Sequence, residues 1–284
     1  MAGSQEERGG SALYYLGSPV PEHNVPVKAG GPADGGQVPR SGSGAPGAVV
    51  ALTGVRVGGR ERHPTAAADG INVHITAGQS VAMYDQADGS AVDLLDVVGG
   101  LRRPRSGQVG VDGVAVHRLS GGSLERYRGE RGLISGRFRL LSSLSVTDNV
   151  LAALRTRRAH AAARDHAAEL LAIAGAARLA TRRVDALTAE QQWRVLIARA
   201  LLAAPRLMLA EDPASVLDPR SARRVQDLLM DAHARFGFTL LLATGRLATT
   251  VRCERVVSLA DGQLTADELT GDDEWTRGRI DRIG

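Results

Sequence analysis

Short, continuously apolar runs constrain the fold of this chain more than any other feature. The runs are SVAMY from Ser80, RLMLA from Arg206, FTLLLAT from Phe238 and RVVSLA from Arg255. Each has the length of a strand, and none shows the alternation of a strand with one face in water. Helix-like stretches separate them. This order predicts an α/β fold in which helices cover both faces of a mostly parallel sheet.

Other elements are expected around these runs. Strands joined by Gly-containing turns are predicted within 49–57 and 71–84, and Asp112-Gly113 predicts the turn of a hairpin. Helices are predicted at 93–98, 188–203 and 221–235. The Ala- and Arg-rich stretch 148–187 is predicted to be helical, with a break near Gly175.

The ends of the chain differ from its middle in composition. Residues 1–48 contain eleven Gly and six Pro, about a third of the segment, which exceeds the level at which compact folding is expected. We therefore predict a disordered tail at 1–48, one domain at 49–270 and a short C-terminal tail at 271–284.

Composition excludes several classes of site. Cys253 is the only cysteine, which excludes an internal disulfide and a cysteine zinc site. The formal charge of +4 is weak support for a nucleic-acid partner. No apolar run reaches the ~18 residues of a membrane span, and the start lacks the apolar core of a signal peptide. A cytoplasmic location is expected.

The stretch SVAMYDQADGSAVDLLDVVGGL, from Ser80 to Leu101, has the frame of a phosphate-binding loop. A buried strand, a tight turn and the start of a helix follow one another, and ligands in such sheets bind at the carboxyl ends of strands. The turn carries Asp85, Asp88 and Asp93 but no lysine, since the only lysine is Lys28.

From about Val49 to Asp267 the chain resembles the ATP-hydrolysing subunits of ABC transporters. The resemblance rests on GLRRPRSGQVGVDG, on RGLISGRFRLLSSLSVTDNV, on LTAEQQWRVLIARALLAAPRLMLAEDPASVLD and on LLLATGRLATTVRCERVVSLADGQL, in that order. The branch serving lipoprotein-release and macrolide-export permeases is the most similar. The resemblance implies a P-loop NTPase-like ABC ATPase domain with a mostly parallel core, an antiparallel β-subdomain and a helical subdomain at about 137–187.

The phosphate loop departs from the family pattern G-x-x-x-x-G-K-[ST], in which glycine N–H groups, a lysine and a hydroxyl hold phosphate and Mg²⁺. The aligned positions are Asp85, Asp88, Gly89, Ser90, Ala91, Val92 and Asp93. Ala91 stands at the lysine and Val92 at the hydroxyl residue. We hypothesise that the aspartates occupy the anion position themselves, which would stabilise the helix start and repel triphosphate.

The other family motifs also differ. Gly136 stands at the glutamine-loop position and Gly245 at the switch histidine. The signature LSGGQ reads Leu187 followed by Thr188, Ala189, Glu190 and Gln191, which places an acid where phosphate would arrive. RLSGG at 118–122 spells the signature but precedes the glutamine-loop region, so we interpret it as a chance match.

Two acids end the Walker B strand in inverted order, Glu211 before Asp212. Either could ligate Mg²⁺ or orient water. The simpler interpretation is a polar strand end before Pro213, with no metal site, and this is the one we favour. Asp218 is the D-loop acid that this chain keeps.

These replacements predict an ABC ATPase-like subunit that does not hydrolyse ATP and serves as scaffold or regulator. Its expected partners are a membrane permease or a sister ATPase, at the inner face of the plasma membrane, with a homodimer as another assembly. ATP and Mg²⁺ are implied by the resemblance, with weak or absent binding. Two alternatives stay open: an ATP-binding export or lipoprotein-release subunit with an atypical nucleotide site, and a basic Arg-rich module that binds nucleic acid.

Overall fold

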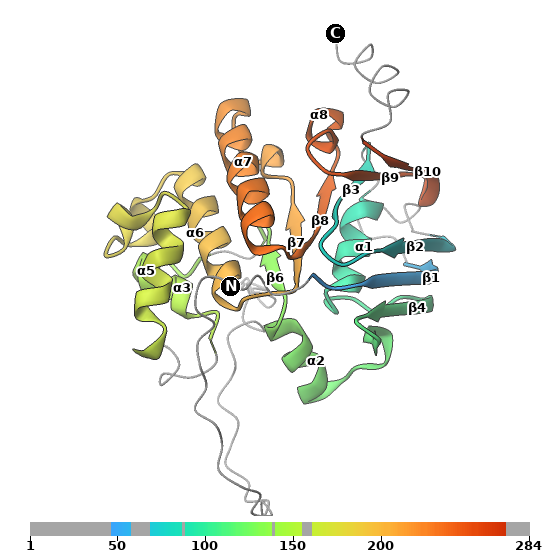
Figure 1. The fold of residues 1–284 in the computed structure, drawn as a ribbon, viewed down its shortest axis with the longest axis horizontal. Helices are drawn as coiled ribbons and strands as arrows, with labels where there is room; N and C mark the ends of the chain where they lie inside the picture. The colour runs from blue at the N-terminus through green and yellow to red at the C-terminus, as the bar shows by residue number, and fades with distance from the viewer. Residues whose placement is uncertain (1–46, 58–68, 87–88, 138–139, 155–160, 271–284) are drawn as a thin grey trace, which may run out of the picture.

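A computed structural model describes residues 47–57, 69–86, 89–137, 140–154 and 161–270 (Figure 1). The expected disorder at 1–46 and the tail at 271–284 lie outside the described residues. Ala48, the last residue of the expected tail, is buried. Its N–H donates to the Arg206 carbonyl at 2.9 Å, and its carbonyl accepts from Thr239 Oγ1 at 2.6 Å.

The central sheet of the described chain has the strand order β10-β9-β3-β8-β7-β6. Its strands are β3 (Ser80–Asp85), β6 (Gly132–Ile134), β7 (Leu207–Glu211), β8 (Thr239–Thr244), β9 (Arg255–Ala260) and β10 (Gln263–Leu269). β9, β3, β8, β7 and β6 are parallel, and β10 pairs antiparallel with β9. The predicted parallel sheet is confirmed.

A second sheet, with order β2-β1-β4-β5, is antiparallel throughout. Its strands are β1 (Val50–Arg56), β2 (Ile71–Ile75), β4 (Ser106–Val111) and β5 (Val114–Ala115). The predicted hairpin turn is present between β4 and β5, where Asp112 and Gly113 have φ of 50° and 77°. Such positive φ values suit the Asp-Gly pair found there.

Neighbouring residues of the central strands face two separate cores. In β3, Val81 and Met83 pack with helix α1 (Ser90–Val98) and the antiparallel sheet. Ala82, between them, packs with the helices on the other side. Because side chains alternate along a strand, a sheet covered on both faces requires apolar residues at every position.

The remaining helices lie around these sheets (Figure 1). They are α2 (Gly121–Gly129), α3 (Val146–Leu151), α5 (Arg164–Ile173), α6 (Ala189–Leu202), α7 (Pro219–Phe236) and α8 (Leu247–Thr250), with 3₁₀ turns at Val116–Arg118, Ala177–Leu179, Val184–Ala186 and Pro213–Ser215. The helices predicted at 188–203 and 221–235 correspond to α6 and α7. α1 begins three residues before the predicted start.

The break expected near Gly175 is confirmed, since α5 ends at Ile173 and Gly175 has a φ of 65°. An uninterrupted helix from Asp148 to that break is wrong. α3 ends at Leu151, and α5 begins only at Arg164. Val150 of α3 and Leu170 of α5 belong to the same buried cluster as the inner face of α6. One continuous helix would carry these residues away from each other, so α3 and α5 are separate helices.

Several strands end side by side at the carboxyl edge of the sheet. β3 ends at Asp85, β7 at Glu211 and β8 at Thr244. Gly245 directly follows β8 and lies close to the end of β3. A Cβ atom on Gly245 would be 3.2 Å from the Asp85 carbonyl oxygen. This edge therefore brings together residues that are far apart in the sequence, as expected for the ligand edge of a parallel sheet.

Candidate functional site

The carboxylate of Asp85 lies at the start of α1. Its Oδ2 accepts a hydrogen bond from the Ala91 N–H at 2.8 Å, and its Oδ1 accepts one from the Gly89 N–H at 3.4 Å. Helix N-termini bind anions because their first N–H groups lack partners within the helix and carry partial positive charge. Asp85 thus places a side-chain anion at the position where a phosphate-binding loop receives its ligand.

Asp93, another aspartate of this loop, has a partner of its own. Asp93 lies in the first turn of α1, is buried, and forms an ion pair with Arg102 at 2.8 Å. Asp88 lies outside the described residues. Among the described aspartates of the loop, the hypothesis that they occupy the anion position is supported for Asp85 and not for Asp93. Asp93 neutralises Arg102 instead, which its register in the sequence did not reveal.

The residues at the lysine and hydroxyl positions supply no polar side chain. Ala91 is buried, and Val92 packs against the core shared by α1 and the antiparallel sheet. Ser90 is buried at the first position of the helix. What remains at this helix start is a set of backbone N–H groups, two of which contact Asp85.

Glu211, at the end of β7, is engaged by two residues that follow β6. Ser135 Oγ donates to Glu211 Oε2 at 2.6 Å. The Arg137 guanidinium forms an ion pair with Glu211 Oε1 and donates to both oxygens of Asp96 of α1, at 2.8 and 3.1 Å. Sequence reasoning missed Asp96, Ser135 and Arg137. The position of Arg137 directly after Gly136, the glutamine-loop position, was a signal that could have identified it.

Asp212 is almost fully buried and accepts four hydrogen bonds. Oδ1 accepts from the Ala214 N–H at 2.9 Å and from Gln226 Nε2 at 2.8 Å. Oδ2 accepts from Thr244 Oγ1 at 2.6 Å and from Thr249 Oγ1 at 2.8 Å. These donors come from the turn after β7, from α7, from β8 and from α8. A carboxylate saturated in this way ties elements together and has little capacity left to take a proton from water.

The glycines at two further motif positions offer no side chain to a ligand. A Cβ atom on Gly136 would meet only Trp193, at 3.9 Å. Gly245 lies against the backbone of Asp85 and Gln86, with 3.2 and 3.8 Å from its Cβ position to their carbonyl oxygens. Space for a side chain is therefore narrow at Gly245 and adequate at Gly136.

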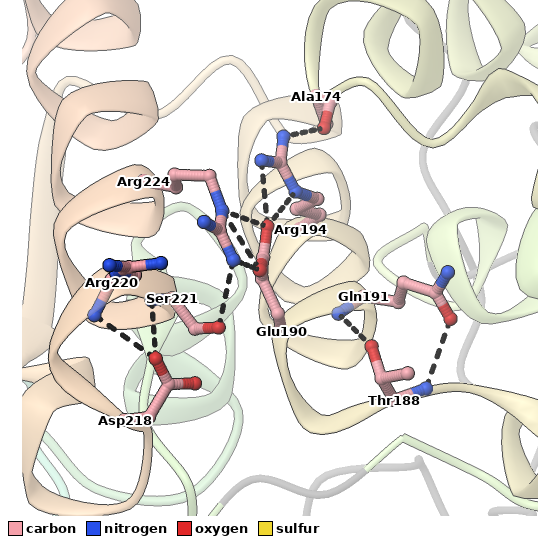
Figure 2. Close-up of polar contacts among 9 residues, drawn as sticks. All are labelled: Ala174, Thr188, Glu190, Gln191, Arg194, Asp218, Arg220, Ser221 and Arg224. Atoms are coloured by element: carbon pink, nitrogen blue, oxygen red, sulfur yellow. Dashed lines mark hydrogen bonds and ion pairs between the residues drawn. The ribbon is translucent and has the colours of Figure 1, made fainter.

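The signature position forms the N-terminus of α6. Thr188 is the N-cap, and its Oγ1 accepts from the Gln191 N–H at 3.3 Å. In return, Gln191 Oε1 accepts from the Thr188 N–H at 3.0 Å, as Figure 2 shows. This is a capping box, in which the two side chains satisfy each other's backbone. The two uncharged polar side chains of the motif, Thr188 and Gln191, are thus used at the start of the helix itself.

Glu190 is held between two arginines (Figure 2). Its Oε1 accepts from Arg194 Nη2 at 2.9 Å, and both of its oxygens accept from Arg224 Nε at 3.1 Å. Arg194 also donates to the Ala174 carbonyl at 3.0 Å, and Arg224 to Ser221 Oγ at 3.0 Å. The cluster joins the end of α5, the start of α6 and the start of α7 without a ligand.

The Glu190 cluster predicts a pH dependence of stability. The hydrogen bonds from Arg224, opposed by burial and helped by Arg194, lower the pKa of Glu190 from 4.5 to about 2. Glu190→Gln is expected to cost about 1 kcal/mol of unfolding free energy at pH 7, a small value because solvent surrounds Arg224. Since the folded pKa is lowered, this difference is present above pH 4.5 and disappears as the pH falls toward 2.

Urea unfolding at several pH values would measure the difference between wild type and Glu190→Gln. Glu130→Gln, at an exposed residue after α2, is the matched control and is expected to leave stability unchanged. A Glu190→Gln deficit that stays constant down to pH 2 would contradict the assignment.

Asp218, the D-loop acid, caps α7. Its Oδ1 accepts from the Arg220 and Ser221 N–H groups at 3.0 and 3.1 Å. Hydrogen bonds from Ser221 and Arg220, together with the nearby Arg224, lower the pKa of Asp218. The residue is exposed, so this cap is the role that its contacts support.

These residues do not fit Mg²⁺ with a triphosphate. Two N–H groups at the start of α1 face Asp85, Glu211 is held by Ser135 and Arg137, and Asp212 has four donors. Within the described ranges, no group of three or more His, Cys, Asp or Glu side chains is arranged to hold a metal ion. Among the same residues, no helix combines the length and apolarity needed to cross a membrane.

Comparison with known proteins identifies the family. The model of the ABC transporter family matches residues 92–215. The lipoprotein-releasing system ATP-binding protein LolD of Anaeromyxobacter dehalogenans is 34% identical over 70% of this chain and 84% of its own length. The chain belongs to the family of ABC transporter ATP-binding subunits.

Other relatives in this family are longer. The methionine import ATP-binding protein MetN of Symbiobacterium thermophilum is 36% identical over 68% of this chain. The macrolide export ATP-binding/permease protein MacB of Pectobacterium atrosepticum is 34% identical over 80% of it. The chain spans 59% of the former and 35% of the latter. The lipoprotein-release and macrolide-export relatives agree with the expected branch, and the methionine importer stands at the same level.

Solved structures confirm the ABC ATPase fold. The dimeric ATP-binding cassette MJ0796, in a post-hydrolysis state bound to ADP and Pi, superposes with a TM-score of 0.69 at 25% identity. The match covers 78% of this chain and 99% of that one.

Proposed function

We propose that this ABC-family subunit does not hydrolyse ATP and acts as a scaffold or regulator of a membrane permease or of a sister ATPase. The observation that carries the proposal is the Asp85 carboxylate at the N-terminus of α1. A phosphate group would have to displace this anion, or lie beside it, at the N–H groups that bind phosphate in such loops.

The charges at the lysine position and at the two acids after β7 also support the proposal. Phosphoryl transfer depends almost entirely on positioning and on stabilisation of the developing charge. In this chain the lysine position is Ala91, and the acids Glu211 and Asp212 are already bonded to protein groups. Little is left to attract Mg²⁺ or to orient an attacking water.

The signature end supports a scaffold or an inhibitor over a half-active partner. The Glu190 carboxylate accepts hydrogen bonds from Arg194 and Arg224. Thr188 and Gln191 bond to each other in a capping box. If this chain paired with an active sister as family members do, its loop and its signature would each weaken one of the two nucleotide sites. The assembly proposed is therefore with a permease, a sister ATPase or a second copy, at the cytoplasmic face of the membrane.

The decisive experiment is MgATP titration of the full chain by calorimetry, with thermal shift and phosphate release measured in parallel. A ligand that binds only the folded state stabilises it by RT ln(1 + [L]/Kd), about 2.7 kcal/mol at a hundredfold excess over Kd. We expect no heat, no shift and no hydrolysis at millimolar MgATP. The lipoprotein-releasing relative from Anaeromyxobacter dehalogenans provides the positive control.

Micromolar binding of MgATP would overturn the proposal and favour the alternative of an ATP-binding subunit with an atypical site. Co-purification with a membrane permease, lost on mutation of the helical segment α3–α5, would support the scaffold role. We do not propose the nucleic-acid alternative, because many described arginines, such as Arg102, Arg194 and Arg224, form ion pairs with carboxylates.

A further inference from the structure

The carboxylates of Asp96 and Glu211 contact the same nitrogen atom of Arg137, near the end of β7. Arg137 Nη2 lies 2.8 Å from Asp96 Oδ1 and also contacts Glu211 Oε1. Arg137 Nη1 donates to the second oxygen of Asp96 at 3.1 Å, so that pair is bidentate. Both acids therefore share one guanidinium nitrogen as their partner.

The surroundings hold this guanidinium in place. Ser135 Oγ accepts from the Arg137 N–H at 3.0 Å and donates to Glu211 Oε2 at 2.6 Å. The side chain of Asp96 is 10% exposed and that of Glu211 is 18% exposed, so water shields neither charge well. Burial works against the charged form of Arg137, but Asp96 and Glu211 outweigh it and raise the pKa of the guanidinium.

We propose that Arg137 is a resident cation, which occupies the position between Asp96 and Glu211 that a divalent cation would take in its absence. Carboxylate oxygens and a serine hydroxyl are the hard oxygen ligands that Mg²⁺ and Mn²⁺ prefer. The inference deepens the proposed function, because it accounts for an acidic site that stays folded and neutralised without metal.

The test removes the guanidinium and supplies an external cation. Mn²⁺, which can be followed by its electron paramagnetic resonance and by calorimetry, would be titrated into the full chain of wild type and of Arg137→Ala. We expect Arg137→Ala to bind Mn²⁺ at least about tenfold more tightly than wild type, because the two carboxylates that contact Arg137 lose its positive charge. Its melting temperature should rise with Mn²⁺, whereas that of wild type should not.

Three control variants test whether Mn²⁺ binding depends on losing the positive charge at Arg137 and on the carboxylate of Glu211. Arg56→Ala removes the arginine of an exposed ion pair with Asp69 and should create no Mn²⁺ dependence. Arg137→Lys keeps a cation in place and should bind Mn²⁺ no better than wild type. Arg137→Ala combined with Glu211→Gln should lose the Mn²⁺ binding gained by the single variant.

If Arg137→Ala folds only when Mn²⁺ or guanidinium ion is added, that rescue supports the proposal by a second measurement. Wild type that binds Mn²⁺ as tightly as Arg137→Ala would overturn it, and so would an Arg137→Ala that is folded and binds no Mn²⁺. MgATP binding by wild type would contradict the proposed function but leave this inference standing, since the two are measured with different ligands.

Discussion

Replacing Asp212 by alanine is expected to lower the free energy of unfolding by about 3 kcal/mol, the largest loss among these variants. The substitution would remove one acceptor each from the amide of Gln226 and from the hydroxyls of Thr244 and Thr249 in the interior. A buried donor that loses its partner keeps the cost of its desolvation. Urea unfolding followed by the fluorescence of buried Trp193 would measure the change.

Asp218→Ala is the matched control for Asp212→Ala. It removes another carboxylate that accepts backbone N–H groups, but at an exposed N-cap, where water can replace the lost acceptor, and should cost much less. Asp212→Asn should lie between the two, because it keeps one acceptor oxygen and the shape of the side chain. An Asp212→Ala loss no larger than that of Asp218→Ala would show that the buried network contributes little.

Replacing Asp85 by alanine is expected to cost about 2 kcal/mol, from the lost cap and the lost charge at the helix N-terminus. The variant would leave the Gly89 and Ala91 N–H groups facing a space with no carboxylate. The effect is smaller than for Asp212 because fewer donors are orphaned. Urea unfolding measures it, with hydrogen exchange of the first turn of α1 as a local readout.

The control for Asp85→Ala is Asp85→Asn, which removes the charge, keeps an acceptor oxygen and should cost about 1 kcal/mol. Equal stability of wild type and Asp85→Ala would contradict the cap. If Asp85→Ala also gained stability from inorganic phosphate while wild type did not, the carboxylate would be identified as the group that excludes phosphate from this position.

The acids at the motif positions share one property: each is bonded to groups of the same chain. Asp85 caps α1, Asp212 joins four elements, and Glu190 joins three helices. Each of these acids has its partners within the chain. These bonds within the chain are the basis on which we propose that the subunit keeps the shape of its family without the family's usual ligand.

The sequence alone determined the parallel sheet, one hairpin turn and the missing lysine. The apolar runs that became β3, β7, β8 and β9 predicted a buried parallel sheet, because only a strand covered on both faces is apolar at every position. Asp112-Gly113 predicted a hairpin turn, because few other pairs tolerate positive φ. The absence of a lysine from the phosphate loop is a property of the sequence itself, since Lys28 is the only lysine in the chain.

Only the tertiary structure decided which charges meet. Arg137 and Asp96 are separated by 41 residues, and Arg224 and Glu190 by 34, so no local pattern pairs them. The same limit explains why the helix expected from Asp148 already ends at Leu151, where packing of α3 and α5 on α6 overrode good helix propensity. Backbone preferences and apolar periodicity depend on residues that are neighbours in the sequence. Ion pairs depend on which side chains the fold brings within reach of each other.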